Sequence, residues 1–323
     1  MIALITIFIL LVLIELAYFR IADKFNIIDK PNLRSSHTSI TLRGGGIIFL
    51  IGMWIYCAFF GFNYPWFMLG LTFIAGVSFI DDVHSVKNSI RLIIHFLSML
   101  LLFYQIGLLQ PEYWYIIVIA LIVCVGVINA YNFMDGINGI TGGYSLAVLT
   151  PLMIVNFNEE FIDHNLLIVA IMSLLVFCFF NFRKKAKCFA GDVGAVGIAF
   201  IILFALGSVI FKTFDISYIV FLAVYGVDSV LTIVHRIMLH ENLGQAHRKH
   251  AYQIMANELK IPHTVVSAVY AFLQAVISFG LIFLPVNHYI YAGAVIALLV
   301  LAYVAFMKKN YHLHEDYLKS KNI

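Results

Sequence analysis

The chain has 323 residues, of which 63% are hydrophobic and only 11% are charged. A soluble globular protein carries roughly 25% charged residues, so this composition excludes a soluble domain and indicates a multi-pass membrane protein. The formal net charge of +3 is small, and we expect the lipid bilayer, and no nucleic acid, among the partners. The four cysteines form no Cys-x-x-Cys pair, and we interpret them as packing residues.

Long apolar runs dominate the sequence, and a membrane-spanning helix needs about 20 mostly apolar residues. We therefore predict an all-α polytopic membrane protein with a single domain over residues 1–323, which ends in a cytoplasmic C-terminal tail at 308–323. About eleven transmembrane helices are expected, in chain order at residues 2–19, 44–62, 65–80, 91–108, 113–130, 142–157, 165–181, 194–211, 217–236, 264–284 and 288–307.

Positive charges divide the predicted loops into two sets. With the N-terminus placed outside, 19 of the 20 Lys and Arg residues fall on the inside, and only Lys212 falls outside. Because cytoplasmic loops are enriched in Lys and Arg, this asymmetry predicts a periplasmic N-terminus and a cytoplasmic C-terminus. The polar stretches then share the cytoplasmic face, as expected for chemistry that needs one compartment only.

The first polar stretch follows the run 65–80, where Asp81 and Asp82 leave the membrane. Adjacent acids at this place are costly unless they bind something. A metal–phosphate or general-base role would suit them. An acidic cap on the next helix is the alternative interpretation.

The second polar stretch, residues 129–143, holds three asparagines, one aspartate and four glycines between two apolar runs. Polar, glycine-rich backbone at membrane depth is tolerated only where it lines protein or a watery cavity. Asn132, Asp135 and Asn138 lie three apart, so a continuing helix would place them on one face. Their amides and carboxylate suit hydrogen bonding to a nucleobase or a sugar, unless the stretch is only a tight helix–helix turn.

The third stretch, Cys188–Gly194, follows a basic run that we interpret as a topology signal facing lipid headgroups. Asp192 stands next to glycine, and a carboxylate on such a permissive backbone suits Mg²⁺, which binds one or two carboxylates together with substrate phosphates. Phe189 could stack on a base, and Asn181 could face the same site.

A fourth stretch, Gln245–Gln253, carries His247, Arg248 and His250, which suit contact with a diphosphate. A zinc site at the His247–His250 spacing and a basic interfacial helix are the competing interpretations, although no further zinc ligands are evident. In a fifth stretch, Arg43 precedes three glycines and could bind an anion. This stretch lacks the Gly-Lys-Ser/Thr ending of a P-loop.

Asp228 is an acid within the predicted span 217–236, with Arg236 two turns later. An ion pair within the helix bundle and a role in the site both remain open for Asp228.

Taken together, the five stretches resemble the polyprenyl-phosphate N-acetylhexosamine-1-phosphate transferases, which include the WecA-type O-antigen initiators and the phospho-MurNAc-pentapeptide translocase. Asp81-Asp82 is similar to the DD motif of that family, and residues 129–139 are similar to NxxNxxDGxDG. Residues 189–194 are similar to FxGDxG, and residues 247–253 to the cytoplasmic His-rich motif. The motifs follow one another in the family's order.

The resemblance implies transfer of a sugar 1-phosphate from a UDP-N-acetylamino sugar to undecaprenyl phosphate, with release of UMP, in the bacterial inner membrane. It implies Mg²⁺ as cofactor, with Mn²⁺ as an alternative, and leaves open a homodimer and the choice between one-step and covalent mechanisms. The implied roles are catalysis by Asp81 and Asp82, metal binding by Asp192, nucleotide-sugar binding by Asn132, Asp135, Asn138, Asn181 and Phe189, and phosphate or sugar binding by Arg43, His247, Arg248 and His250, with Asn129 and Asp228 as further candidates.

The chain departs from the family pattern at three places. Asn138 replaces the second acid of DGxDG, Ala195 replaces the serine that follows GDxG, and the His-rich motif is interrupted at 248–249. The interrupted motif looks closer to O-antigen initiators that use 6-deoxy amino sugars such as FucNAc or QuiNAc, with UDP-GlcNAc as the other donor. A secondary transporter or flippase is the alternative function, but it predicts mid-membrane charges and polar loops on both sides.

Overall fold

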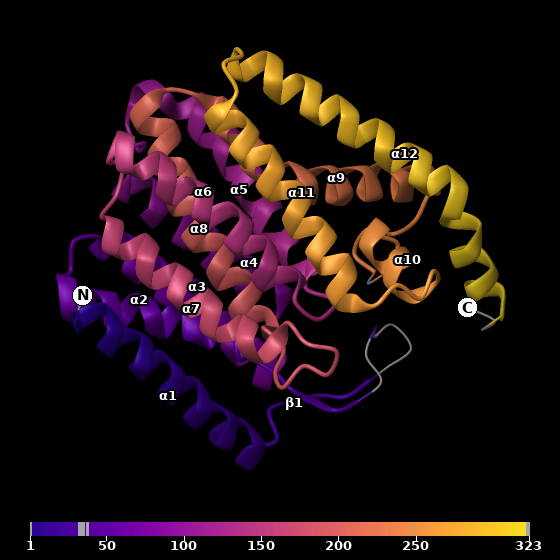
Figure 1. The fold of residues 1–323 in the computed structure, drawn as a ribbon, viewed down its shortest axis with the longest axis horizontal. Coiled ribbons are helices and arrows are strands. Elements are labelled where there is room, and N and C mark those ends of the chain that lie inside the picture. The colour runs from indigo at the N-terminus through magenta and orange to yellow at the C-terminus, as the bar shows by residue number, and fades with distance from the viewer. Residues whose placement is uncertain (1, 32–35, 37–38, 246, 321–323) are drawn as a thin grey trace.

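The computed structural model describes residues 2–31, 36, 39–245 and 247–320. Arg34 and Lys321, which contribute to the charge asymmetry, lie outside these residues. The described chain forms an all-α bundle whose helices run side by side (Figure 1), which confirms the predicted fold class. Within this part of the chain, 10 helical segments are long and apolar enough to cross a membrane.

The helices have the following bounds: α1 Ile2–Lys24, α2 Ile47–Phe60, α3 Pro65–Val83, α4 Asn88–Gln105, α5 Trp114–Met134, α6 Ile140–Glu159, α7 His164–Asn181, α8 Gly191–Thr213, α9 Ala223–Met238, α10 Ala251–Asn257, α11 His263–Phe283 and α12 His288–Ser320. Two 3-10 segments, η1 Pro111–Tyr113 and η2 Ile216–Leu222, precede α5 and α9. The short strands β1 Ile28–Asp29 and β2 Thr41–Leu42 pair antiparallel.

Helix α8 is the centre of the bundle. It packs against α2, α3, α5 and α6, and 83% of the residues in its most apolar 18-residue stretch are buried. A helix that is hydrophobic on all sides can lie in a protein interior or face lipid, and the burial of α8 places it in the interior of the bundle. Four neighbouring helices therefore fix the position of α8, and with it the position of the residues in its first turn.

Most polar loops gather at one end of the bundle. In Figure 1 the β1–β2 hairpin, α10 and the C-terminal end of α12 lie toward the same side, while the N-terminus lies at the opposite end. This arrangement agrees with the predicted collection of polar stretches on one face.

Three predicted elements differ from the structure. The predicted span 44–62 is the 14-residue helix α2, because residues 44–46 form a turn against the start of α8 before the helix begins. The predicted span 217–236 is divided into the 3-10 segment η2 and α9. The predicted span 288–307 is longer in the structure, since α12 continues to Ser320.

Candidate active site

Asp192 lies in the first turn of α8, where a helix presents unpaired backbone N–H groups and the positive end of its dipole. The carboxylate of Asp82, at the end of α3, accepts the backbone N–H of Asp192 at 2.9 Å and that of Val193 at 3.0 Å. The Asp82 side chain has no exposed surface. Asp82 therefore caps α8 from a neighbouring helix and fixes the position of Asp192.

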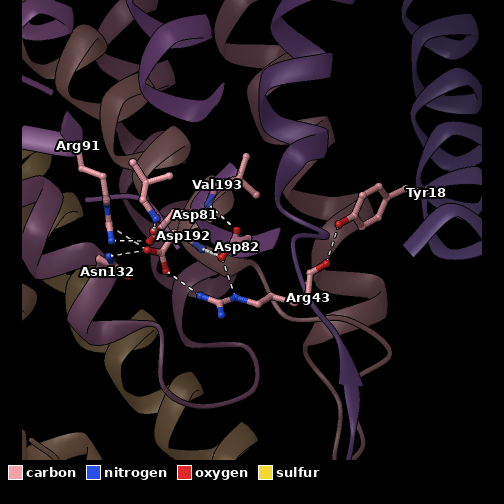
Figure 2. A network of polar contacts seen from close by, with 9 residues as sticks. Tyr18, Arg43, Asp81, Asp82, Arg91, Asn132, Asp192 and Val193 are labelled. Carbon is pink, nitrogen blue, oxygen red and sulfur yellow. Dashed lines mark hydrogen bonds and ion pairs between the residues drawn. The ribbon is translucent and has the colours of Figure 1, made fainter. Parts of the chain in front are cut away.

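Three carboxylates and two guanidinium groups form one network (Figure 2). Arg43 binds Asp82 through Nε at 2.7 Å and Asp192 through Nη2 at 3.2 Å. Arg91 binds Asp81 through Nη1 at 2.6 Å and Asp192 through Nη2 at 2.9 Å. Each arginine thus joins Asp192 to one acid of the predicted pair, and one negative charge is left uncompensated.

The loop that carries Arg43 is held by its backbone. Tyr18 of α1 donates its hydroxyl to the Arg43 carbonyl at 2.6 Å. Gly45 and Gly46 donate their N–H groups to the carbonyls of Phe189 and Ala190, at 2.9 and 3.1 Å. The Arg43 guanidinium is therefore positioned by the segment that leads into Asp192, which lies 149 residues away.

A pocket of about 200 Å³ opens beside this network. We call it the carboxylate pocket. Its lining includes all five predicted nucleotide-sugar residues, namely Asn132, Asp135, Asn138, Asn181 and Phe189, together with Arg43 and Asp192.

Asp135 lines this pocket together with Asp192 and Asp29, and the Thr141 hydroxyl donates to Asp135 at 2.6 Å. Burial is the main reason that the pKa of Asp135 is raised to about 7, and the negative charges of Asp192 and Asp82 raise it further. Asp135 therefore changes its charge near neutral pH.

Asn138 and Asn181 support the pocket from behind. The Asn138 amide donates to the carbonyls of Arg183 at 2.8 Å and Lys184 at 3.2 Å. Asn181 accepts the N–H of Gly139 at 2.7 Å and donates to the Cys188 carbonyl at 2.8 Å. Asn138 thus holds the basic loop at its backbone, a task that an amide performs and a carboxylate, which only accepts, does not.

A second pocket, of about 430 Å³, lies on the other side of Asn132. We call it the histidine pocket. Its polar lining consists of Asn88, Arg91, His95, Asn129, Asn132, Gln245, His247 and His250. Most predicted site residues therefore line one of two adjoining pockets, with Asn132 in both, and Arg91 reaches from the histidine pocket to Asp192. The predicted residues in neither lining are Asp81, Asp82, Asp228 and Arg248.

The histidines of the second pocket have different surroundings. Burial, with help from the neighbouring His250, Arg236 and Lys249, lowers the pKa of His247 to about 3, so its imidazole is neutral at physiological pH. The ring of His250 lies with Nδ1 at 3.2 Å from the carboxylate of Asp228, which is itself buried. The carboxylate at Nδ1 holds the imidazole ring of His250 in place, and its buried Nε2 has no hydrogen-bond partner among the described residues.

Asp228 has no place in the lining of either pocket. Besides His250, it accepts the hydroxyl of Tyr270 at 2.6 Å and the backbone N–H of Ala251 at 3.1 Å. It therefore orients His250 and the start of α10. Its predicted alternative partner, Arg236, instead binds Glu241 and the carbonyls of the following loop.

Arg248 lies apart from both pockets. Its guanidinium binds Glu258 at 2.8 Å and stacks over the ring of Tyr317. The described geometry therefore separates Arg248 from the neighbouring histidines, with which the sequence grouped it.

The donor set favours a hard cation over zinc. Among the described residues, no three His, Cys, Asp or Glu side chains are arranged to hold a metal ion, so His247 and His250 lack the further ligands that zinc needs. Asp192 and Asp135 line one pocket and bring oxygen ligands only. Mg²⁺ usually takes one or two carboxylates and completes its coordination with water and substrate phosphates, which this pair fits.

Two residues that line the histidine pocket, Arg91 and His95, were not predicted as site residues. The sequence indicated only a topology role for Arg91 and a helix-packing role for His95. They lie one turn apart on α4, so they share a helix face. Nε2 of His95 is buried, and no hydrogen-bond partner is recorded for it among the described residues. A polar face on the first turns of α4, directly after Asp81-Asp82, is the feature that could have identified them.

Comparison with known proteins gives a consistent answer. Residues 64–210 match the model of a family described as glycosyl transferase family 4. A probable undecaprenyl-phosphate N-acetylglucosaminyl 1-phosphate transferase of Bacillus subtilis is 25% identical over 72% of this chain and 70% of its own. An undecaprenyl-phosphate α-N-acetylglucosaminyl 1-phosphate transferase of Thermotoga maritima is 24% identical over 74% and 76%.

A phospho-N-acetylmuramoyl-pentapeptide-transferase of Fervidobacterium nodosum is 30% identical over 42% of this chain and 49% of its own. The matched family region contains the acid pair on α3, the polar stretch after α5 and Asp192. These matches confirm the resemblance that the motifs indicated: over most of its length, the chain is similar to two undecaprenyl-phosphate N-acetylglucosaminyl 1-phosphate transferases.

Proposed function

We propose that this protein transfers an N-acetylamino-sugar 1-phosphate from a UDP-sugar to undecaprenyl phosphate, giving undecaprenyl-diphospho-sugar and UMP. The observation that carries the proposal is the network of Asp81, Asp82, Asp192, Arg43 and Arg91 at the junction of two pockets. A reaction between two phosphates needs charge neutralisation and alignment of both partners more than covalent help.

The carboxylate pocket is assigned to the nucleotide end of the donor. Phe189 offers an aromatic face for the base, and Asn132 offers an amide. Asp192, with Asp135, would hold Mg²⁺ against the diphosphate, where the ion neutralises charge on the transferring phosphoryl group. In this assignment the nucleoside lies in the carboxylate pocket, and the diphosphate points toward Asn132, which also lines the histidine pocket.

The histidine pocket is assigned to the acceptor phosphate. Arg91, His95 and His250 surround it with groups that suit a phosphate, and it lies between α4, α5 and the loop before α10. A lipid phosphate that enters from the inner leaflet would reach this pocket with its isoprenoid chain still in the bilayer. Asn132 separates the two substrates by a single side chain.

The arginines are suited to exchange partners during the reaction. Arg43 and Arg91 each hold Asp192 with one nitrogen and a second acid with another. With a cation bound by the Asp192 oxygens, each guanidinium would stay anchored on Asp82 or Asp81 and would have N–H groups available for phosphate oxygens. A phosphate oxygen of the acceptor then attacks the β-phosphorus of the donor. The bond between the β-phosphorus and the oxygen that bridges the two donor phosphates breaks, and UMP leaves.

The donor is proposed to be UDP-GlcNAc or a UDP-6-deoxy-amino sugar such as UDP-FucNAc or UDP-QuiNAc. The names of the relatives support GlcNAc. The interrupted His-rich motif supports the 6-deoxy sugars. The product would initiate O-antigen or another cell-envelope polysaccharide at the cytoplasmic face of a bacterial inner membrane.

The test is UMP release by membranes that contain the protein, with undecaprenyl phosphate, Mg²⁺ and each UDP-HexNAc supplied separately. We expect release with one donor or a few, dependent on the lipid acceptor. Release that does not depend on undecaprenyl phosphate, or none with GlcNAc, GalNAc, FucNAc or QuiNAc donors, would contradict the proposal. Vesicle uptake of the same donors without UMP would favour a transporter instead.

A further inference from the structure

The C-terminal helix is longer than a membrane requires. Helix α12 has 33 residues, which corresponds to roughly 50 Å at 1.5 Å per residue, whereas the hydrocarbon core is about 30 Å thick. Its last third therefore extends beyond the membrane. In Figure 1 this part of α12 runs alongside α10 toward the C-terminus.

A buried polar cluster joins this extension to the segment before α10. Glu258 accepts from Arg248 at 2.8 Å and lies 3.1 Å from Nδ1 of His314. The Arg248 guanidinium stacks on Tyr317, 4.3 Å from the ring centroid. The exposed side-chain fractions are 4% for Glu258, 11% for Arg248 and 1% for His314. We call these four residues the clasp.

Two further contacts tie the same elements together. Lys249 forms an ion pair with Glu241 and lies over the ring of Tyr311, a residue of α12. Ala251 and Ile254 of α10 share a buried apolar cluster with Met307 of α12. The extension of α12 is therefore packed as well as hydrogen-bonded.

The side chains of residues 247–250 divide between two directions. His247 and His250 line the histidine pocket. The two residues between these histidines point the other way: Arg248 binds Glu258, and Lys249 binds Glu241 and lies over a tyrosine ring of α12. Because the backbone is continuous, a shift of the clasp would move both histidines relative to the pocket.

We propose that the C-terminal extension of α12 is a positioning element for the reaction, which acts through the clasp on His247 and His250. Its residues touch no substrate pocket, so they are positioning residues and not catalytic ones. The activity readout rests on the proposed transferase function. A surface ion pair would contribute little, but the burial of Glu258 and His314 makes the geometry of the clasp costly to change.

The test compares Tyr317→Ala, Tyr317→Phe and His314→Ala in the full-length protein, with His312→Ala as the matched control. His312 lies on the exposed side of α12, one turn or less from His314. For Tyr317→Ala and His314→Ala we expect kcat to fall about 10- to 100-fold, because a misplacement of about 1 Å can cost that much. KM for the UDP-sugar should change less than kcat, since the clasp does not line the carboxylate pocket. Tyr317→Phe, which keeps the ring beside the Arg248 guanidinium, should lose less activity than Tyr317→Ala, and His312→Ala should keep the wild-type rate.

Hydrogen–deuterium exchange gives a second readout that does not depend on the reaction. Faster exchange confined to residues 247–258 in Tyr317→Ala and His314→Ala would support the clasp. The positioning role would be overturned if both variants showed unchanged exchange and unchanged kcat. It would also be overturned by faster local exchange with a wild-type kcat, or by faster exchange spread over the whole bundle. If the wild-type protein releases no UMP, the transferase proposal fails, and the exchange experiment still decides whether the clasp holds this segment.

Discussion

Replacing Asp82 by asparagine should lower the stability of the protein as well as its activity. The carboxylate receives three donors, from the N–H groups of Asp192 and Val193 and from Arg43. An asparagine side chain keeps one oxygen and places an amide group, which donates, where the second oxygen stood. At least one N–H group at the start of α8 then loses its acceptor in a buried position.

The magnitude follows from the contacts. An unpaired buried N–H costs about 1–3 kcal/mol. The contact with Arg43 adds about 1 kcal/mol at most, because that guanidinium is 33% exposed and keeps its contact with Asp192. The expected loss is about 1–4 kcal/mol, which corresponds to a fall of roughly 2–6 °C in melting temperature for a chain of this size.

The assay is thermal unfolding in detergent, followed by fluorescence, for Asp82→Asn and for Asp192→Asn as the comparison. Asp192 accepts from Arg43 and Arg91, which keep their contacts with Asp82 and Asp81, and from Asn132 at 3.4 Å. Because no buried backbone N–H loses its acceptor, this variant should melt within about 2 °C of the wild type. If Asp82→Asn also melted within about 2 °C of the wild type, the cap on α8 would not be the main role of Asp82.

Other residues of the site should respond in different ways. Asp192→Asn should reduce UMP release at least about 100-fold, since charge neutralisation at the transferring group is lost, and near-normal rates would remove Asp192 as the metal ligand. The raised pKa of Asp135, about 7, means that a proton occupies it at lower pH and must leave before a cation binds. The half-saturating Mg²⁺ concentration should therefore rise about tenfold per pH unit below 7 and level off above it, and a profile that Asp135→Asn does not flatten would contradict this role. Asn138→Asp should lower the melting temperature by the equivalent of about 1–3 kcal/mol, because a carboxylate would face the carbonyls of Arg183 and Lys184; a more stable variant would refute this interpretation.

Much of the architecture could be predicted because the relevant signals are local. Apolar runs determine which segments cross the membrane, and acids or amides beside glycines stand out against them. Asp192, Asp135 and Asn132 were found in this way, and the structure brings them to one pocket. The eleven spans were predicted from run length, and ten of them correspond to described helical segments long enough to cross a membrane. The other, α2, is shorter than its apolar run because residues 44–46 turn against α8.

The division of the site into two pockets could not be predicted, because it depends on tertiary contacts. Arg91 reaches Asp192 only because α4 packs against α3 and brings a residue 101 positions away within 2.9 Å. Arg248 and His250 differ in direction within a segment that has no helical or strand periodicity to indicate a face. The long α12 looked like a span followed by a tail, since the tyrosines and histidines after Met307 are too polar to count as membrane helix.

The contact between the Arg43 loop and the start of α8 limits how the site can vary. A Cβ on Gly46 would overlap the Cα of Gly194, and backbone hydrogen bonds join the two segments on either side of this contact. The two segments therefore behave as one rigid unit, although they are far apart in the sequence. Side chains on that unit can be exchanged while its backbone stays fixed, so new substrate preferences in such proteins should arise through pocket residues and through the loop before α10, and not through movement of Arg43 relative to Asp192.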